Sequence, residues 1–362
     1  MSAVASSDNE VQLGRALLMM AAGVVVVAGL RAAGTILIPF MFAIFLALIG
    51  FPIVEWLCRK GVRLGLAVLV TVLLECAALS ILGYLISTTF DEFAAAAPGY
   101  LNGLVDKVRG LLVSLQERGL DLSAWISPER LDAGAVVDLA GGIVRGTVRG
   151  VASFVSYVLL VFVILITAMF EVVALPEKLK SAKRSQLMSE NVERVMEEIQ
   201  KYLGVKTLVS LATGVLVAIA VWILGLPVPL FWAVLAFLLN YIPAIGSIIA
   251  AIPAVLVAMV QQGWGVALAV AVVYLGINFL LGNLIEPALM GRQFGLSTLV
   301  VFMAMVFWGW IWGPVGMILS VPLTMIIKIV LEQSSELRWL AVLMGPAAPM
   351  AAAAAARQSP KG

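Results

Sequence analysis

Hydrophobic residues along the chain gather into long runs that polar stretches separate. Windows of about 20 apolar residues are typical of membrane-spanning helices. They predict spans at Leu13–Leu30, Thr35–Leu57, Leu64–Phe90, Val151–Val173, Thr207–Leu226 and Gly265–Leu284. Two further apolar runs, Leu230–Val260 and Leu299–Val330, carry no charge before Lys328. About eight hydrophobic segments therefore predict an all-α polytopic membrane protein.

Each of the last two runs is interrupted at its centre by proline and glycine. The breaks are Asn240-Tyr241-Ile242-Pro243-Ala244-Ile245-Gly246-Ser247 and Trp312-Gly313-Pro314-Val315-Gly316. An unbroken helix of about 31 residues would measure about 46 Å, against a hydrocarbon core of roughly 30 Å. Each arm alone, at about 22 Å, is slightly too short to cross. Both runs therefore predict helical hairpins that enter the bilayer and return to the same side.

A span followed by a broken run occurs twice, at Thr207–Val260 and Gly265–Val330. A hairpin that returns to its own side leaves each unit with one net crossing, so two tandem units have opposite orientations. This is the inverted repeat of secondary transporters, whose substrate sites lie at the repeat interface. Two ordinary proline-kinked spans are the alternative reading.

Polar stretches divide the chain into five parts. Residues 1–90 form three spans, 91–150 an extracytoplasmic amphipathic segment, and 151–206 the fourth span with an amphipathic helix over Val192–Leu203. We expect that helix to lie along the membrane surface. Residues 207–344 form the transport core, and 345–362 a disordered tail. The leucine face of Leu101–Leu115 caps the membrane domain or makes a subunit contact, and the second reading predicts a homo-oligomer.

Basic residues set the orientation. Lysines and arginines gather at Arg59–Arg63 and at Lys178–Arg184, two spans apart, which places both loops in the cytoplasm. The N- and C-termini then also lie in the cytoplasm.

Composition removes several classes of function. The chain is 62% hydrophobic and 12% charged, and it contains no histidine, which excludes histidine metal sites and Ser-His-Asp triads. Cys58 and Cys76 lack the spacing of a metal or disulfide framework. The net charge of +2 carries no information about nucleic acid, and we expect no nucleic-acid partner. We predict no cofactor, no metal site and no catalytic residue; the partners are the lipid bilayer and a small solute or ion.

Broken helices leave backbone amides and carbonyls unpaired, and these groups can bind a polar solute. We therefore predict a substrate site at the two breaks and on the span between them. Its residues are Asn240, Tyr241, Pro243, Gly246, Ser247, Asn278, Asn283, Gly313, Pro314 and Gly316. An intramembrane asparagine is also often only a helix–helix hydrogen bond, and this reading stays open for Asn240.

Two carboxylates are candidates for proton or ion coupling. Glu75 lies near the middle of the third span, and Glu286 ends the sixth beside Pro287. Ionisable residues within spans are costly and mark ion or proton pathways. A structural pair with Arg15 or Lys328 is the alternative for Glu75, and a position at the membrane interface is the alternative for Glu286.

The tryptophans of the second broken run have two readings. Trp308, Trp310 and Trp312 could stack on a ring-shaped solute. An interfacial aromatic belt or packing at the hairpin tip is the simpler reading.

The chain resembles the autoinducer-2 exporter family, also described as PerM-like permeases. The resemblance covers nearly the whole chain and is most specific between Asn240 and Pro322. Its motifs are Pro39-Phe40, the break at Asn240–Gly246 with Ile252-Pro253, Asn283-Leu284-Ile285-Glu286-Pro287-Ala288-Leu289-Met290-Gly291, and Gly313–Gly316 with Val321-Pro322. Ser247 and Thr298 stand where many relatives have proline, so the stiffness of the hairpin tips differs here.

The resemblance implies a bacterial inner-membrane exporter of small solutes, with autoinducer-2 as the namesake substrate. Some relatives are associated with sodium/proton exchange. A sodium/proton antiporter and an ion channel are therefore the alternatives to a secondary transporter. An intramembrane enzyme or a scaffold fits the pattern less well, because neither explains two duplicated breaks.

Overall fold

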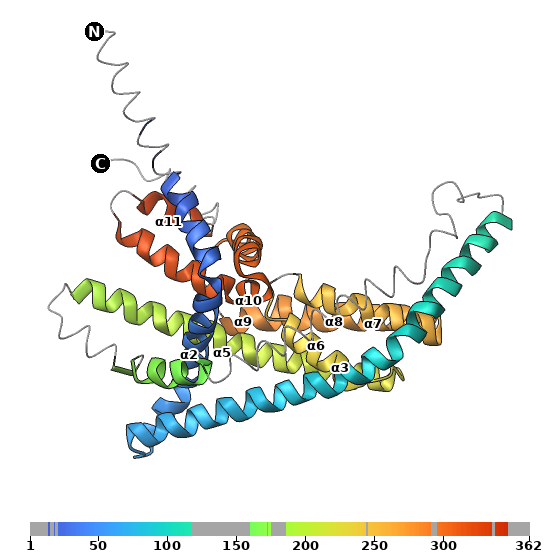
Figure 1. Ribbon diagram of the computed structural model, residues 1–362, viewed down its shortest axis with the longest axis horizontal. Helices are drawn as coiled ribbons and strands as arrows, with labels where there is room; N and C mark the ends of the chain where they lie inside the picture. Colours follow the sequence, from blue (N-terminus) through green and yellow to red (C-terminus); the bar gives the residue numbers. More distant parts are fainter. Residues whose placement is uncertain are drawn as a thin grey trace, which may run out of the picture.

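The computed structural model of the protein describes Gly14, Leu18 and residues 21–117, 160–171, 173–174, 186–243, 245–290, 295–334 and 337–346. Within these residues all regular secondary structure is helical, without strands (Figure 1). The elements are α2 (Gly34–Arg59), α3 (Leu64–Glu117), α5 (Gln186–Ile223), α6 (Pro229–Leu239), α7 (Gly246–Gln262), α8 (Trp264–Asn278), the π-helix η2 (Phe279–Ile285), α9 (Glu286–Met290), α10 (Thr298–Gln333) and α11 (Arg338–Met344).

Five of these helices are long and apolar enough to cross a membrane, which confirms the all-α polytopic fold class. They are Gly34–Arg59, Leu64–Phe93, Met196–Ile223, Trp264–Met290 and Thr298–Gln333. The predicted first and fourth spans appear as the shorter helices Ala21–Ala32 and Leu160–Glu171, and the rest of both predicted ranges lies largely outside the described residues. Residues 118–150 and 347–362 also lie outside them.

Two long helices cross boundaries that the polar stretches had suggested. α3 runs for 54 residues, with Pro98 inside it, so the third span and the start of the amphipathic segment form one helix. α5 runs for 38 residues through the boundary predicted at residue 206. The separate surface helix over Val192–Leu203 is therefore wrong. α5 is continuous because Ile199, Tyr202 and Leu203 are buried in the core rather than lying along a membrane surface.

The first broken run folds as predicted into two short helices. α6 has 11 residues and α7 has 17, and the two pack against each other across the break at residues 240–245. Gly246 requires the absence of a side chain, because a Cβ there would overlap the carbonyl oxygen of Leu239 in the preceding arm. The hairpin shape therefore depends on backbone contact at its tip.

The second broken run also folds back on itself, because α10 consists of two helical arms joined by a kink at Gly313. Gly313 adopts φ 64° and ψ −147°, a left-handed conformation that favours glycine. The indole Nε1 of Trp308 donates to Thr324 Oγ1 at 3.3 Å. In a straight helix, residues 16 positions apart would be separated by about 24 Å. The two arms of α10 therefore lie against each other.

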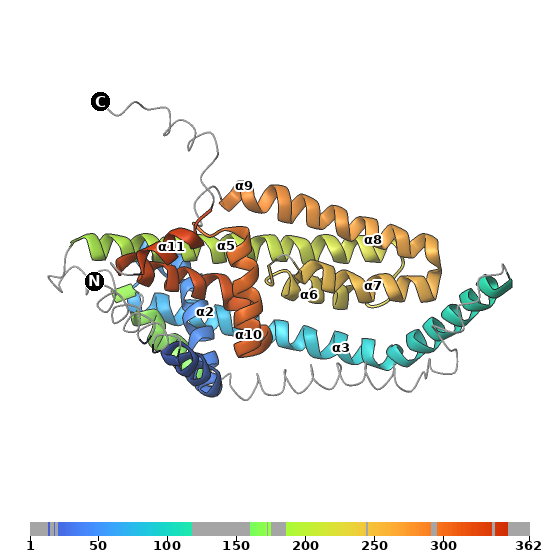
Figure 2. The same ribbon diagram turned by 90° about the horizontal axis from the view of Figure 1, so that it is seen from above.

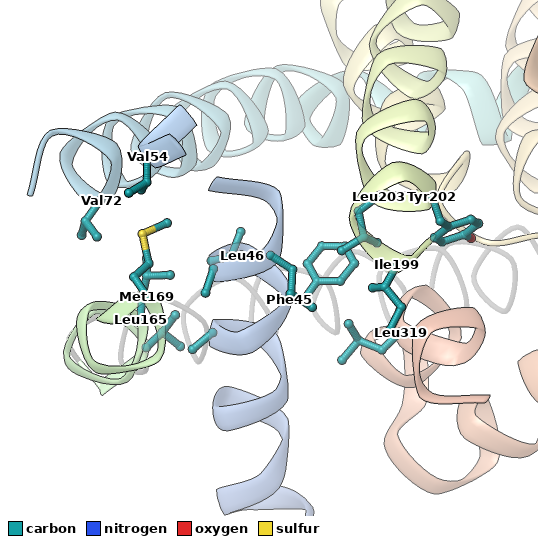
Figure 3. Packing of buried hydrophobic residues seen from close by; sticks show 14 of the residues in the cluster. Phe45, Leu46, Val54, Val72, Leu165, Met169, Ile199, Tyr202, Leu203 and Leu319 are labelled. Carbon is teal, nitrogen blue, oxygen red and sulfur yellow. The ribbon is translucent and has the colours of Figure 1, made fainter. Parts of the chain in front are cut away.

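The core joins elements that are far apart in the sequence. One cluster brings together side chains of α2, α3, the Leu160–Glu171 helix, α5 and α10, as Figure 3 shows for Phe45, Val72, Met169, Leu203 and Leu319. A second cluster joins α5 to α6, α7 and α8 around Trp232, whose side chain is fully buried. α5 is thus the element that both clusters share.

α5 and the helix α8–η2–α9 lie side by side and run in opposite directions (Figure 2). The α6–α7 hairpin packs on the C-terminal half of α5, where Gly214 lies against the backbone of Ala233. The α10 hairpin packs on the N-terminal half, near Leu203. Each hairpin thus has its own half of α5.

Candidate functional site

A stripe of polar side chains runs along the buried side of α5. Lys206, Ser210 and Thr213 are buried at successive turns of the helix, and Thr207 beside them is half-buried. The hydroxyls of Thr207 and Thr213 donate to backbone carbonyls one turn earlier, which satisfies their donors within an apolar environment. The stripe meets the tip of the first hairpin on one side and α9 on the other.

The tip of the first hairpin is held to this stripe by two hydrogen bonds. Asn240 Nδ2 donates to Ser210 Oγ at 2.9 Å, and both side chains are buried. The hydroxyl of Tyr241 donates to Thr207 Oγ1, also at 2.9 Å. Asn240 therefore does make a helix–helix hydrogen bond, as the alternative interpretation expected. The same bonds place an amide, a phenol and two hydroxyls together at the break.

The rest of the first break consists of backbone and small side chains. The carbonyl of Pro243 accepts a hydrogen bond from the Ile245 amide at 2.7 Å, so this turn satisfies part of its own backbone. Gly246 is buried, and Ser247 is half-buried in the first turn of α7. These predicted residues lie directly beside Asn240 and Tyr241 in the chain.

Glu286 forms an ion pair that sequence reasoning missed. Lys206 Nζ lies 2.9 Å from one carboxylate oxygen of Glu286 and 3.0 Å from the other. The exposed fractions of the two side chains are only 7% and 16%. Tyr202, one turn before Lys206, lies close enough to Glu286 and Tyr241 to interact with both electrostatically. A charged pair and the hairpin tip thus share one stretch of α5.

Asn278 and Asn283 fall at either side of an irregular turn. Asn278 ends α8, is half-buried, and lies against Gly282 in η2. Asn283 is exposed, whereas Glu286 is half-buried. Regular α-helical spacing would place all three residues on one sector of the helix, but the wider π turn changes the phase of the helix. The described contacts therefore bring Glu286 to α5 and leave Asn283 on the exposed side of η2.

The second hairpin tip carries backbone rather than polar side chains. Gly313 makes the turn, Pro314 is exposed, and Gly316 is buried with no room for a Cβ beside the carbonyl of Trp308. Trp312 is buried, and its Nε1 donates to the carbonyl of Leu30 at 3.0 Å.

The tryptophan rings of this hairpin have intramolecular partners. The ring centres of Trp308 and Trp312 lie 5.0 Å apart, and both indole nitrogens are hydrogen-bonded within the protein. Trp310 is exposed, with the Arg31 guanidinium 5.0 Å from its ring centre. Packing at the hairpin tip therefore accounts for Trp308 and Trp312.

Glu75 lies apart from this polar group. It is buried between α2, α3 and the Leu160–Glu171 helix, close to Gly50, Thr71 and Met169. Neither carboxylate oxygen has a hydrogen-bond partner among the described residues. The predicted pair with Lys328 is wrong, because Lys328 pairs with Glu332 at 3.2 Å, one turn along α10. Arg15 lies outside the described residues.

Comparisons with known proteins agree on one family. The family model described as AI-2E family transporter matches residues 16–336. The chain is 36% identical over 338 residues to the putative transport protein YhhT of Escherichia coli K12, covering 92% of this chain and 95% of that one. It is 35% identical over 334 residues to the AI-2 transport protein TqsA of the same strain, covering 91% and 94%. A putative transport protein of Haemophilus influenzae is 36% identical over 348 residues, covering 93% and 98%. These names describe transporters rather than enzymes.

Proposed function

Because the chain belongs to the AI-2E family of transporters, we propose that it exports a small polar solute across the bacterial inner membrane by secondary-active transport. The name of the relative TqsA makes autoinducer-2, or a solute of similar size and polarity, the first candidate cargo. In this proposal an ion gradient drives the transport, and an elevator or rocking movement exposes the solute site to each side of the membrane in turn.

The observation that carries the proposal is the polar group at the tip of the first hairpin. Asn240 and Tyr241 lie at a helix break and are hydrogen-bonded to Ser210 and Thr207 on the buried polar stripe of α5. A hydroxyl or carbonyl oxygen of a solute can replace Ser210 or Thr207 as the acceptor, so that the two donors of the hairpin tip stay paired. The solute then takes the place of α5 at the hairpin tip.

The antiparallel arrangement of α5 and α8–η2–α9 supports an inverted repeat. Each of the two helices is followed in the chain by a hairpin, and the two hairpins pack on opposite halves of α5. Inverted repeats with discontinuous helices are typical of transporters that alternate access around a site between the repeats. The glycine-tight tips at Gly246 and Gly316 then form the two gates.

Sodium/proton exchange is the second candidate, and the Lys206–Glu286 pair favours it. A buried carboxylate with a lysine counter-ion can hold a proton or a sodium ion in the lysine's place. The candidates differ in what they move: an exporter moves the solute, with or without ions, whereas an antiporter moves ions alone.

Flux measurements on proteoliposomes separate the candidates. Labelled autoinducer-2 is loaded inside or supplied outside, with a proton gradient, a sodium gradient or neither. Gradient-stimulated, saturable solute flux that falls in Asn240→Ala is the expected result. Sodium/proton exchange without solute flux would establish the antiporter instead.

A further inference from the structure

Within that proposed transport function, we infer that Lys206 is an internal counter-ion that a monovalent cation must displace from Glu286. Once displaced, the Lys206 ammonium moves to the hairpin tip, where the solute binds. Lys206 thereby links occupation of the cation site to the solute site. Lys206 could not be identified from the sequence, because it stands at the edge of a charged segment and its partner follows 80 positions later.

The ion pair is poorly explained by stability alone. Taking two charges out of water into a protein interior is costly, and their mutual attraction often does no more than offset this cost. Lys206 stands at the start of the apolar part of α5, and its side chain is only 7% exposed. A buried ion pair at the end of a membrane-spanning helix is therefore a candidate for an ion or substrate pathway.

The two partners differ in access. The Glu286 side chain is 16% exposed, about twice the fraction of Lys206, and the next three residues, Pro287 to Leu289, are exposed on α9. A cation that reaches the pair therefore finds the carboxylate more accessible than the ammonium. The geometry therefore suits a cation that competes for Glu286 rather than an anion that competes for Lys206.

Two hydroxyl groups close to Lys206 can accept hydrogen bonds from the displaced ammonium. Thr207, its neighbour in the chain, accepts from Tyr241, and Ser210, one turn further along α5, accepts from Asn240. The four-carbon stem of lysine lets the ammonium change partners without movement of the helix. Among the residues that the structure describes, Lys206 lies against the Glu286 carboxylate and Tyr202 lies near it, and of these two only Lys206 carries a positive charge.

A cation-binding assay on the purified full-length protein tests the inference without any solute. Equilibrium binding of ²²Na⁺ is measured at pH 8 in detergent, with choline replacing sodium. The Glu286→Gln variant should lose the site. In Lys206→Gln, which removes the competitor, the half-saturating sodium concentration should fall on the order of tenfold. Lys206→Arg holds the carboxylate with a bidentate fork and should raise that concentration.

A matched control uses the exposed lysine of the same helix. Lys201 is exposed on α5, and Lys201→Gln should bind sodium as the wild type does. Lys206→Arg keeps the positive charge, so it serves as the decisive variant where Lys206→Gln fails to fold. Sodium binding that survives in Glu286→Gln, or that weakens in Lys206→Gln, would overturn the inference.

Protons are the other cation that can fill the site. In that case wild-type protein binds no sodium, and an infrared carboxyl band that is missing from Glu286→Gln grows as the pH is lowered from 8 to 5. Absence of both the sodium and the infrared signal would overturn the inference. Solute affinity should rise with the bound cation in the wild type but not in Lys206→Gln. Failure of the wild type to bind solute would count against the transport proposal alone.

Discussion

The two hairpins share the construction of their tips and differ in what those tips hold. In both, a glycine in the turn after the break, Gly246 or Gly316, packs against a carbonyl of the preceding arm. The first tip adds Asn240 and Tyr241, bound to hydroxyls of α5. The second tip adds Trp312, bound to the carbonyl of Leu30.

This difference separates two roles that the sequence had combined in one site. Polar side chains at a helix break can exchange their partners for a solute, whereas buried indoles contribute apolar area and a single donor each. The first hairpin is therefore the better candidate for solute binding. The second is the better candidate for a gate anchored to the N-terminal helix.

The largest expected effect comes from adding a β-carbon at either tip. In Gly246→Ala and Gly316→Ala the new methyl group overlaps a backbone carbonyl, which a side-chain rearrangement cannot relieve. Overpacking of this kind costs about 1–3 kcal/mol, occasionally more. We expect both variants to lose solute flux and to unfold at lower temperature in detergent. Gly276→Ala is the control, because that glycine faces open space. Wild-type flux in both tip variants would show that the tips are not gates.

The next largest effect should distinguish the two hairpins: a substitution in the first should weaken solute binding, and a substitution in the second should lower stability. Asn240→Ala removes the amide that holds Ser210 and should raise the KM for solute about tenfold, equivalent to about 1.4 kcal/mol. Trp312→Phe removes the donor to Leu30 and should lower the unfolding temperature while leaving the KM unchanged. The two measurements are a KM from proteoliposome flux and a thermal unfolding midpoint. A raised KM in Trp312→Phe would mean that both tips bind solute.

The smallest effect is expected from Glu75, which lies outside both hairpins. Glu75→Gln keeps the shape of the side chain and removes its ability to ionise. Since neither oxygen has a partner among the described residues, folded protein should be recovered at the wild-type level. We expect the pH dependence of flux to flatten, measured between pH 6 and 8 with Glu55→Gln, an exposed carboxylate, as control. An unchanged pH profile would leave Glu75 a structural role.

Most of the fold could be predicted from the apolar runs and the breaks within them. Hydropathy located the long helices, and the proline–glycine clusters located both hairpin turns, because these residues interrupt helical hydrogen bonding wherever they occur. Helix continuity was not readable in the same way. The charge pattern of residues 190–201 is typical of a separate surface helix. In the structure this stretch belongs to α5, and Ile199 and Leu203 are buried in the core.

The site could be predicted only where its chemistry is local in the sequence. Asn240 and Tyr241 adjoin a break and were therefore visible. Lys206 could not be predicted in this way. The predicted span begins at Thr207 and therefore leaves Lys206 out, and its counter-ion Glu286 is distant in the chain. The exposed position of Asn283 depends on the π turn of η2, which an α-helical periodicity does not anticipate.

The central claim is that the two hairpins belong to units of opposite orientation, and cysteine labelling from each side of the membrane tests it most directly. Single cysteines are placed at the exposed positions Gln262 and Ala288, after Cys58 and Cys76 are replaced by serine. Returning hairpins put Gln262 outside the cell and Ala288 in the cytoplasm, so membrane-impermeant maleimide added to whole cells should label only the first. Labelling of Gln262 from the cytoplasmic side, with Ala288 reached from outside, would contradict the account.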